Sequence, residues 1–266
     1  MINRIPSVLL VTLDSCRWDT FQLGVSRDLE SFAVFRQAFC HGTYTLPSHI
    51  SAFSAILPDT VEPLPYYNRF AKSVFRLSTR EANAQSLFQF CEEDQSIIRA
   101  FNRLGHRTIG VGAVRWFRSP VLTHDFSEFH FTGIHMERQM EILEDACLTD
   151  DRSAFLFLNV GETHEPYEFG GAIEETMISR ARMRERFAGG FRQCDFDKQV
   201  AAVRYATKRL AVFLELLSGS GKPYVVAVTS DHGECFGEDS MYGHGFFHPK
   251  VMAVPLGIFG VNYDLP

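Results

Sequence analysis

Three apolar runs, each followed directly by polar residues, constrain the fold of this chain more than any other feature. They cover residues 7–13, 154–160 and 224–228. Short apolar runs of this kind are typical of strands that are covered on both faces, as in a parallel sheet flanked by helices. Open sheets of that class carry their chemistry at the carboxyl ends of the strands. The polar residues after each run are therefore the first candidates for a functional site.

Helical patterns alternate with these strands, and the alternation predicts an α/β fold with a largely parallel central sheet and helices on both faces. We expect one domain over residues 1–266, without an obvious C-terminal subdomain. Residues 59–80 are expected to form a loop-rich segment over the active face, and 173–193 a mobile lid or a solvated helix. The remaining expected elements are helices at 47–56, 94–104, 136–147 and 200–217, and strands at 108–114 and 254–259.

Charge and cysteine content restrict the partners and the compartment. A net charge of -6 argues against nucleic acid or an anionic membrane as the main partner. A small anionic substrate remains compatible, because a metal ion reverses the local field. The 6 cysteines form no CxxC pair and have no regular spacing, which favours reduced thiols in the cytoplasm. No segment has the length of a signal sequence or a membrane span, so we predict a cytoplasmic protein.

The run at 224–228 leads into Asp231, His232 and Gly233, and His244 follows between two glycines. A carboxylate beside an imidazole supplies one hard and one borderline metal ligand, and glycine lets backbone approach closely. Asp14 ends the first run in the same way. Taken alone, Asp14 is about as well explained as a helix N-cap as it is by metal binding.

Thr45 precedes Pro47 and Ser48, a pattern that suits the first turn of a helix. A hydroxyl at that place faces the positive end of the helix, where backbone N–H groups stabilise anions or an alkoxide. The simpler interpretation is that Thr45 only caps the helix.

Taken together, these motifs resemble the sulfatase branch of the alkaline phosphatase superfamily. Residues 45–49 (Thr-Leu-Pro-Ser-His) are similar to the Cys-x-Pro-Ser-Arg motif of sulfatases, with Thr45 in place of the modified cysteine. Residues 230–234 with 243–245 look more like phosphoethanolamine transferases, which also use a threonine nucleophile, and like lipoteichoic acid synthase catalytic domains. Residues 161–167 resemble the His-x-Pro-Tyr segments of these families. The resemblance implies an alkaline-phosphatase-like fold.

With this resemblance we predict that Asp14, Thr45, Asp231 and His232 share one divalent cation. The imidazole favours Zn²⁺ or Mn²⁺ over Ca²⁺, which prefers oxygen throughout. His164 and His244 are predicted to hold the oxygens of the transferred group, to act as general acid, or to bind a second metal ion. Further candidates for substrate contacts, for which a structural role is as well supported, are Arg17, Ser48, His49, Arg115 and His248.

Departures from the sulfatase pattern narrow the chemistry. Thr45 cannot become formylglycine, so ordinary arylsulfatase chemistry is not expected. Ser15 stands where sulfatases often carry a second aspartate ligand, and His49 replaces the arginine of the motif. Three functions remain open: a hydrolase of phosphate mono- or diesters through Thr45, a phosphoryl transferase to an alcohol, and a catalytically degenerate metal-binding partner protein. A small soluble phosphoester is the expected substrate, and the oligomeric state is not predicted.

Overall fold

The computed structural model describes residues 5–54, 75–77, 88–90, 96–171 and 190–265. Nearly all of the loop-rich segment expected at 59–80, and most of the lid or helix expected at 173–193, lie outside these residues. The expected single-domain organisation therefore stays a prediction.

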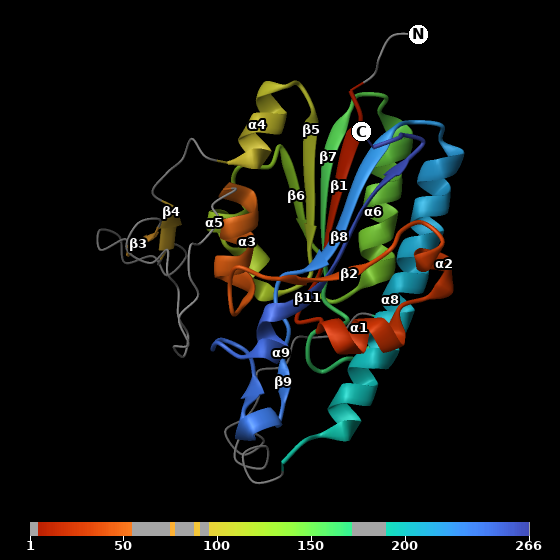
Figure 1. The fold of residues 1–266 in the computed structure, drawn as a ribbon. Helices are drawn as coiled ribbons and strands as arrows, with labels where there is room; N and C mark the ends of the chain where they lie inside the picture. The colour runs from red at the N-terminus through yellow and green to blue at the C-terminus, as the bar shows by residue number, and fades with distance from the viewer. Residues whose placement is uncertain (1–4, 55–74, 78–87, 91–95, 172–189, 266) are drawn as a thin grey trace.

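A seven-stranded sheet forms the centre of the described part of the chain, with the strand order β2-β11-β8-β1-β7-β5-β6 (Figure 1). Parallel pairing joins β8, β1, β7, β5 and β6, whereas β11 runs antiparallel to both β8 and β2. The predicted α/β class with a largely parallel sheet is confirmed. The strands are β1 (Ser7–Leu13), β2 (Arg36–Phe39), β5 (Arg107–Gly112), β6 (Glu128–Phe131), β7 (Ala154–Val160), β8 (Tyr224–Ser230) and β11 (Ala253–Val261).

The central strand β1 shows why the apolar runs become strands. Leu9, Val11 and Leu13 point to one face and are 0% exposed. Val8 and Leu10 point to the other face and pack against a second cluster of apolar side chains. Because both faces are covered by helices, both sets of residues must be apolar, and this produces the uninterrupted run.

Helices cover both faces of the sheet, as predicted. On one face lie α1 (Trp18–Gly24), α2 (Arg27–Glu30), α6 (Met136–Thr149) and α8 (Gln193–Gly219). On the other face lie α3 (Thr45–Ser54), α4 (Ile97–Arg103), the 3-10 helix η1 (Arg115–Arg118) and α5 (Pro120–Thr123). Figure 1 shows α6 and α8 on the side of the sheet opposite to α3 and α4.

Short elements complete the described chain, and the sequence pattern did not predict them. Strand β2 has mostly exposed residues, so no apolar run marks it. Helix α8 begins at Gln193, several residues before the expected start at residue 200. The apolar pattern did not indicate this earlier start, because the first turn of the helix is mostly polar. The remaining elements are β3 (Phe75–Leu77), β4 (Phe88–Phe90), β9 (Cys235–Phe236), η2 (Glu238–Ser240), β10 (Tyr242–Gly243) and α9 (Pro249–Met252).

Candidate metal centre and active site

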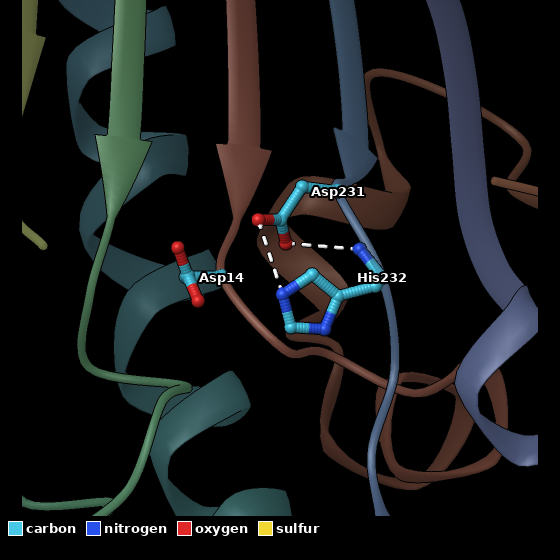
Figure 2. A group of neighbouring side chains, drawn as sticks. All are labelled: Asp14, Asp231 and His232. Carbon is cyan, nitrogen blue, oxygen red and sulfur yellow. Dashed lines mark hydrogen bonds and ion pairs between the residues drawn. The ribbon is translucent and has the colours of Figure 1, made fainter. Parts of the chain in front are cut away.

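The ends of the neighbouring strands β1 and β8 bring together three side chains that can bind a metal ion. Asp14 follows β1, and Asp231 and His232 follow β8. One ligand atom from each residue lies within 4.8 Å of the others, and all three residues are buried. Figure 2 shows the Asp14 carboxylate and the His232 ring side by side, with Asp231 between the two strand ends.

Hydrogen bonds leave one oxygen of Asp231 available for a cation. Its Oδ1 accepts from the backbone N–H of Ser15 at 3.1 Å and from that of His232 at 2.9 Å. Its Oδ2 is buried and has no hydrogen-bond partner among the described residues. A buried acceptor without a donor costs free energy unless something binds it. The free oxygen therefore fits a metal ligand.

The orientation of His232 is set by its own backbone neighbourhood. Its Nδ1 lies 2.9 Å from the carbonyl oxygen of Gly233, so Nδ1 carries the proton and donates. The unprotonated Nε2 lies 3.4 Å from Oδ2 of Asp231. Gly233 is required at this point, because a Cβ there would stand 2.2 Å from the carbonyl oxygen of Lys250.

Asp14 is 0% exposed and is held from both sides. Its Oδ1 accepts from the hydroxyl of Ser15 at 3.2 Å, and its Oδ2 accepts from the side-chain amide of Asn159 at 3.1 Å. Thr163, just after β7, donates to the backbone carbonyl of Asp14 at 2.7 Å. The loops after β1 and β7 are therefore joined at the metal cluster.

The electrostatics of this cluster favour a bound cation. Burial raises the pKa of Asp14, and the neighbouring Asp231 carboxylate raises it further. Burial likewise raises the pKa of Asp231 to about 6. Burial, followed by the proximity of His244, lowers the pKa of His232 to about 3 and keeps its imidazole neutral. Two buried carboxylates and a neutral imidazole are a donor set that suits a divalent transition metal.

Thr45 stands at the start of α3 and reaches this cluster from the other face of the sheet. Its side chain is buried, and its Oγ1 lies 3.5 Å from Nε2 of His232. The hydroxyl of Thr45 therefore lies next to Nε2 of His232, the ring nitrogen that would bind a metal ion. Because Thr45 lies in the first turn of α3, the positive end of this helix points toward the metal cluster.

The structure also brings His164 and His244 to this place. The ring centroid of His244 lies 4.4 Å from that of His232 and 5.8 Å from that of His164. His164 follows β7, and His244 follows the short strand β10. Within the described ranges, only Asp14, Asp231 and His232 meet as three potential metal ligands, and a second metal ion near His164 and His244 stays a prediction.

Three of the predicted substrate contacts have other roles in the structure. The guanidinium of Arg17 is buried and forms ion pairs with Asp19 at 2.7 Å and Glu238 at 2.6 Å. Two neighbouring carboxylates therefore bind the charge of Arg17, and its contact with substrate stays a prediction.

His49 is 1% exposed and lies beneath the site. Its Nδ1 is 2.8 Å from the carbonyl oxygen of Thr45, and its Nε2 is 3.1 Å from the hydroxyl of Thr12. Burial lowers the pKa of His49 to about 4, so the ring is neutral. It cannot replace the charge of the arginine found in the sulfatase motif, and it supports α3 instead.

His248 caps the short helix α9, where its Nδ1 accepts from the backbone N–H of Lys250 at 3.0 Å. Its Nε2 lies 3.2 Å from Asp239, and the ring is buried. The substrate contact of His248 stays a prediction. For Ser48 and Arg115 the substrate contact stays a prediction. Ser48 is buried in α3, and its hydroxyl has no partner among the residues described; Arg115 is exposed on η1.

Four further residues support the site and were given no role from the sequence. Asn159 is the one amide within the apolar run of β7, which is the signal that could have identified it. Gln199 on α8 donates to the carbonyl oxygens of Ser15 at 2.9 Å and Thr163 at 3.0 Å.

Glu234 and Tyr167 lie within the two motif segments, and the hydroxyl of Tyr167 donates to the Glu234 carboxylate. Burial alone would raise the pKa of Glu234, but hydrogen bonding and the charge of His244 outweigh it and lower that pKa to about 2.

Comparison with known families identifies the family of this chain. The sulfatase family profile matches residues 6–255. The chain therefore belongs to the sulfatase family, as the motifs predicted. A search of curated proteins finds no match.

Solved structures of the alkaline phosphatase superfamily share the fold. The periplasmic domain of phosphoethanolamine transferase EptC from Campylobacter jejuni matches with TM-score 0.66 and 14% identity, over 97% of this chain and 80% of that one. The corresponding Escherichia coli domain, in complex with zinc, matches with TM-score 0.62 and 10% identity, over 97% and 73%. Phosphonate monoester hydrolase from Agrobacterium radiobacter matches with TM-score 0.58 and 15% identity, over 96% and 68%. At these identities the likeness concerns the fold.

The family comprises hydrolases and transferases that act on sulfate or phosphate esters, and the superfamily depends on divalent metals. Among the helices that the structure describes, none combines the length and the apolar character needed to cross a membrane.

Proposed function

We propose that this chain is a metal-dependent phosphoesterase that forms a covalent phospho-enzyme through Thr45. The observation that carries the proposal is the 3.5 Å distance between Oγ1 of Thr45 and Nε2 of His232, beside the carboxylates of Asp14 and Asp231. A hydroxyl at the edge of a buried set of metal ligands is placed to serve as a nucleophile. A threonine that only capped the helix would gain nothing from this position.

Asp14, Asp231, His232 and Thr45 would hold the cation, and the imidazole favours Zn²⁺ or Mn²⁺ over Ca²⁺. When bound, the cation lowers the pKa of a coordinated hydroxyl and neutralises charge on the transferred group. The residues fit it because Oδ2 of Asp231 is buried without a donor and Nε2 of His232 is unprotonated.

In the first step the oxygen of Thr45 bonds to phosphorus, and the bond from phosphorus to the leaving alcohol breaks. The proton lost by Thr45 is balanced by one that the leaving oxygen gains, with His164 or His244 as the donor. In the second step water cleaves the phospho-threonine, which restores the hydroxyl and releases phosphate from a monoester substrate or a phosphate monoester from a diester substrate. His164 and His244 would also hold the equatorial oxygens, where phosphoryl transfer concentrates charge.

A transferase reaction is the second candidate, and the fold shared with EptC favours it. It differs only in the acceptor, because an alcohol replaces water in the second step. A degenerate metal-binding protein is less well supported, since Thr45 and the three ligands are all retained at one place.

For the substrate we propose a small phosphoester, with no role for nucleic acid or a membrane surface. We also propose a cytoplasmic location, which the free thiols of Cys16, Cys40, Cys147, Cys194 and Cys235 support. The EptC neighbours are periplasmic domains, so cell fractionation is needed to test the location.

The decisive experiment measures hydrolysis of an aryl phosphate, an aryl phosphodiester and the matching aryl sulfate by the zinc- or manganese-loaded protein. We expect turnover of a phosphate ester and far weaker turnover of the sulfate, because a sulfated threonine lacks the elimination route that formylglycine provides. Thr45→Ala should lower the rate at least about 10³-fold, or about 4 kcal/mol in transition-state stabilisation.

Thr45→Ser is the matched control, because it keeps the hydroxyl and should retain much of the rate. Equal turnover of the sulfate, or wild-type rates in Thr45→Ala, would overturn the mechanism. Adding a primary alcohol and measuring the phosphorylated alcohol separates the transferase from the hydrolase.

A further inference from the structure

Tyr167, Glu234 and His244 form a hydrogen-bonded chain beside the metal cluster. The Tyr167 hydroxyl donates to Oε2 of Glu234, and Oε1 of Glu234 lies 3.3 Å from Nδ1 of His244. Glu234 is 3% exposed and Tyr167 is 5% exposed, so the carboxylate is isolated from solvent. Each oxygen of the carboxylate thus has its own partner, and the group has a single orientation.

The local fold explains why Glu234 and His244 face each other. Strands β9 and β10 pair antiparallel, with Phe236 opposite Tyr242 and Cys235 opposite Gly243. Continuing this register by one residue places Glu234 opposite His244. Directly opposed residues in an antiparallel pair present their side chains to each other.

Tyr167 reaches the same carboxylate from a different part of the sheet. It ends the turn after β7, where its backbone N–H donates to the carbonyl oxygen of His164 at 2.8 Å. Its ring packs edge-on against Phe236 of β9, with centroids 5.9 Å apart. The hydroxyl of Tyr167 therefore joins the turn that carries His164 to the hairpin that carries His244.

We propose that Glu234 and Tyr167 are positioning residues that fix the imidazole of His244, with Nδ1 protonated toward Glu234 and Nε2 directed at the transferred group. A carboxylate that accepts from one ring nitrogen sets both the tautomer and the orientation of the ring. The His244 ring lies 4.4 Å from that of His232, so its free edge stays beside the metal cluster. The identity of the transferred group rests on the proposed function, whereas the orientation of His244 does not.

Side-chain ¹⁵N NMR of the zinc-loaded, histidine-labelled protein tests this directly, with the His244 signals assigned from the His244→Gln variant. In the wild type we expect the non-exchanging proton on Nδ1 of His244. Glu234→Ala should shift the His244 nitrogens and expose Nδ1 to exchange, while the zinc content stays stoichiometric. Glu234→Gln should restore much of the wild-type spectrum, because its amide oxygen can still accept from Nδ1.

Turnover gives the second measurement. Glu234→Ala and Tyr167→Phe should each lower kcat about 10- to 100-fold with little change in KM, as for partners that orient a site imidazole. Asp239→Ala is the matched control. It removes the carboxylate 3.2 Å from Nε2 of His248, and it should change neither the His244 signals nor kcat.

A His244 ring without a proton on Nδ1 in the wild type, or His244 signals unchanged in both Glu234→Ala and Tyr167→Phe, would overturn the proposal. Tyr167→Phe keeps the buried ring, so it carries the test even if Glu234→Ala does not fold. A protein with the expected NMR signals and no phosphoesterase activity would refute the proposed function and leave the positioning role intact.

Discussion

The side-chain amide of Asn159 donates to Oδ2 of Asp14 at 3.1 Å, although 145 residues separate the two. The amide oxygen of Asn159 accepts from the backbone N–H of Ala113 at 3.2 Å and of Val114 at 3.4 Å. One buried side chain on β7 thus connects the loop after β5 to the metal ligand after β1. It also leaves Asp14 with a fixed orientation before any metal binds.

Asn159→Ala is expected to weaken metal binding about 10- to 100-fold, because a residue that orients a ligand contributes to affinity at that level. Zinc affinity should be measured by competition with a chelator of known affinity. Asn102→Ala is the control, since Asn102 bonds the carbonyl oxygen of Asp125 away from the site. Equal zinc affinity in Asn159→Ala and the wild type would contradict this role.

Asp231→Ala is expected to remove the metal. Asp231 supplies the buried oxygen Oδ2, which has no hydrogen-bond donor among the described residues. Its other oxygen, Oδ1, is held by two backbone N–H groups, so the carboxylate has a fixed orientation that the remaining ligands cannot replace. Elemental analysis of protein purified without chelator should find a transition metal near stoichiometry in the wild type and little in the variant. Asp239→Ala, whose side chain is 84% exposed, should keep its metal. Full metal content in Asp231→Ala would refute the ligand assignment.

Glu162 makes the stability of the protein depend on pH. Its Oε1 accepts from the backbone N–H of Met136, while burial raises its pKa from 4.5 to about 7. The folded protein therefore binds this proton more tightly than the unfolded chain does. The free energy of unfolding should fall as the pH rises from about 4.5 to about 7, and this loss is complete above that range.

Glu162→Gln removes the charge and keeps an oxygen that accepts from Met136. It should raise the free energy of unfolding at pH 8 by on the order of 3 kcal/mol and change it little at pH 4.5. Urea unfolding at both pH values measures this difference. Glu141→Gln, on the exposed side of α6, should show no such pH dependence; a similar profile in both variants would exclude Glu162 as the source.

Arg17 should contribute to the stability of the fold. Its guanidinium forms ion pairs with Asp19 and Glu238 and lies 4.8 Å from the ring centre of Phe236. Arg17→Met should lower the free energy of unfolding by about 3 kcal/mol, the lower end for a broken buried ion pair, because Asp19 keeps its contact with Lys250.

The exposed pair of Arg138 and Glu141 provides a control, where Arg138→Met should lower the free energy of unfolding by less than about 1 kcal/mol. Thermal unfolding measures both, and a cost for Arg17→Met no greater than the control would contradict the assignment.

Much of the fold follows from the sequence because the sheet is covered on both faces. The runs that became β1 and β7 match the expected bounds, and β5 carries Gly110 and Gly112 where neighbouring rings pack against the backbone. A Cβ on Gly110 would stand 2.4 Å from Phe129, and one on Gly112 would stand 2.5 Å from Phe117. Strands β2 and β6 were missed because they lie at the two edges of the sheet, where burial is incomplete and no apolar run is needed.

The candidate site was predictable where polar residues end buried strands. Asp14, Asp231 and His232 meet as expected, whereas the contacts of Arg17 with Glu238 and of His248 with Asp239 were not predicted, because they depend on loop geometry. Asp239 lies 9 residues from His248, and Glu238 lies 221 residues from Arg17. No local pattern in the sequence reports such contacts. The same limit applies to the hydrogen bond between Tyr167 and Glu234, which joins two motifs across 67 residues.

The position of β1 between β7 and β8 has a consequence for when the metal site can form during synthesis on the ribosome. Within the described sheet, the central strand β1 is made before its neighbours, yet its partner residues in β8 come 217 positions later, as Ser7 and Tyr224 show. Asp14 thus leaves the ribosome long before Asp231 and His232 exist. Contacts this distant in sequence form slowly and late. The nascent chain therefore has no complete metal site to fill until residues 231 and 232 emerge, so metal binding should follow the synthesis of β8 rather than guide the early steps of folding.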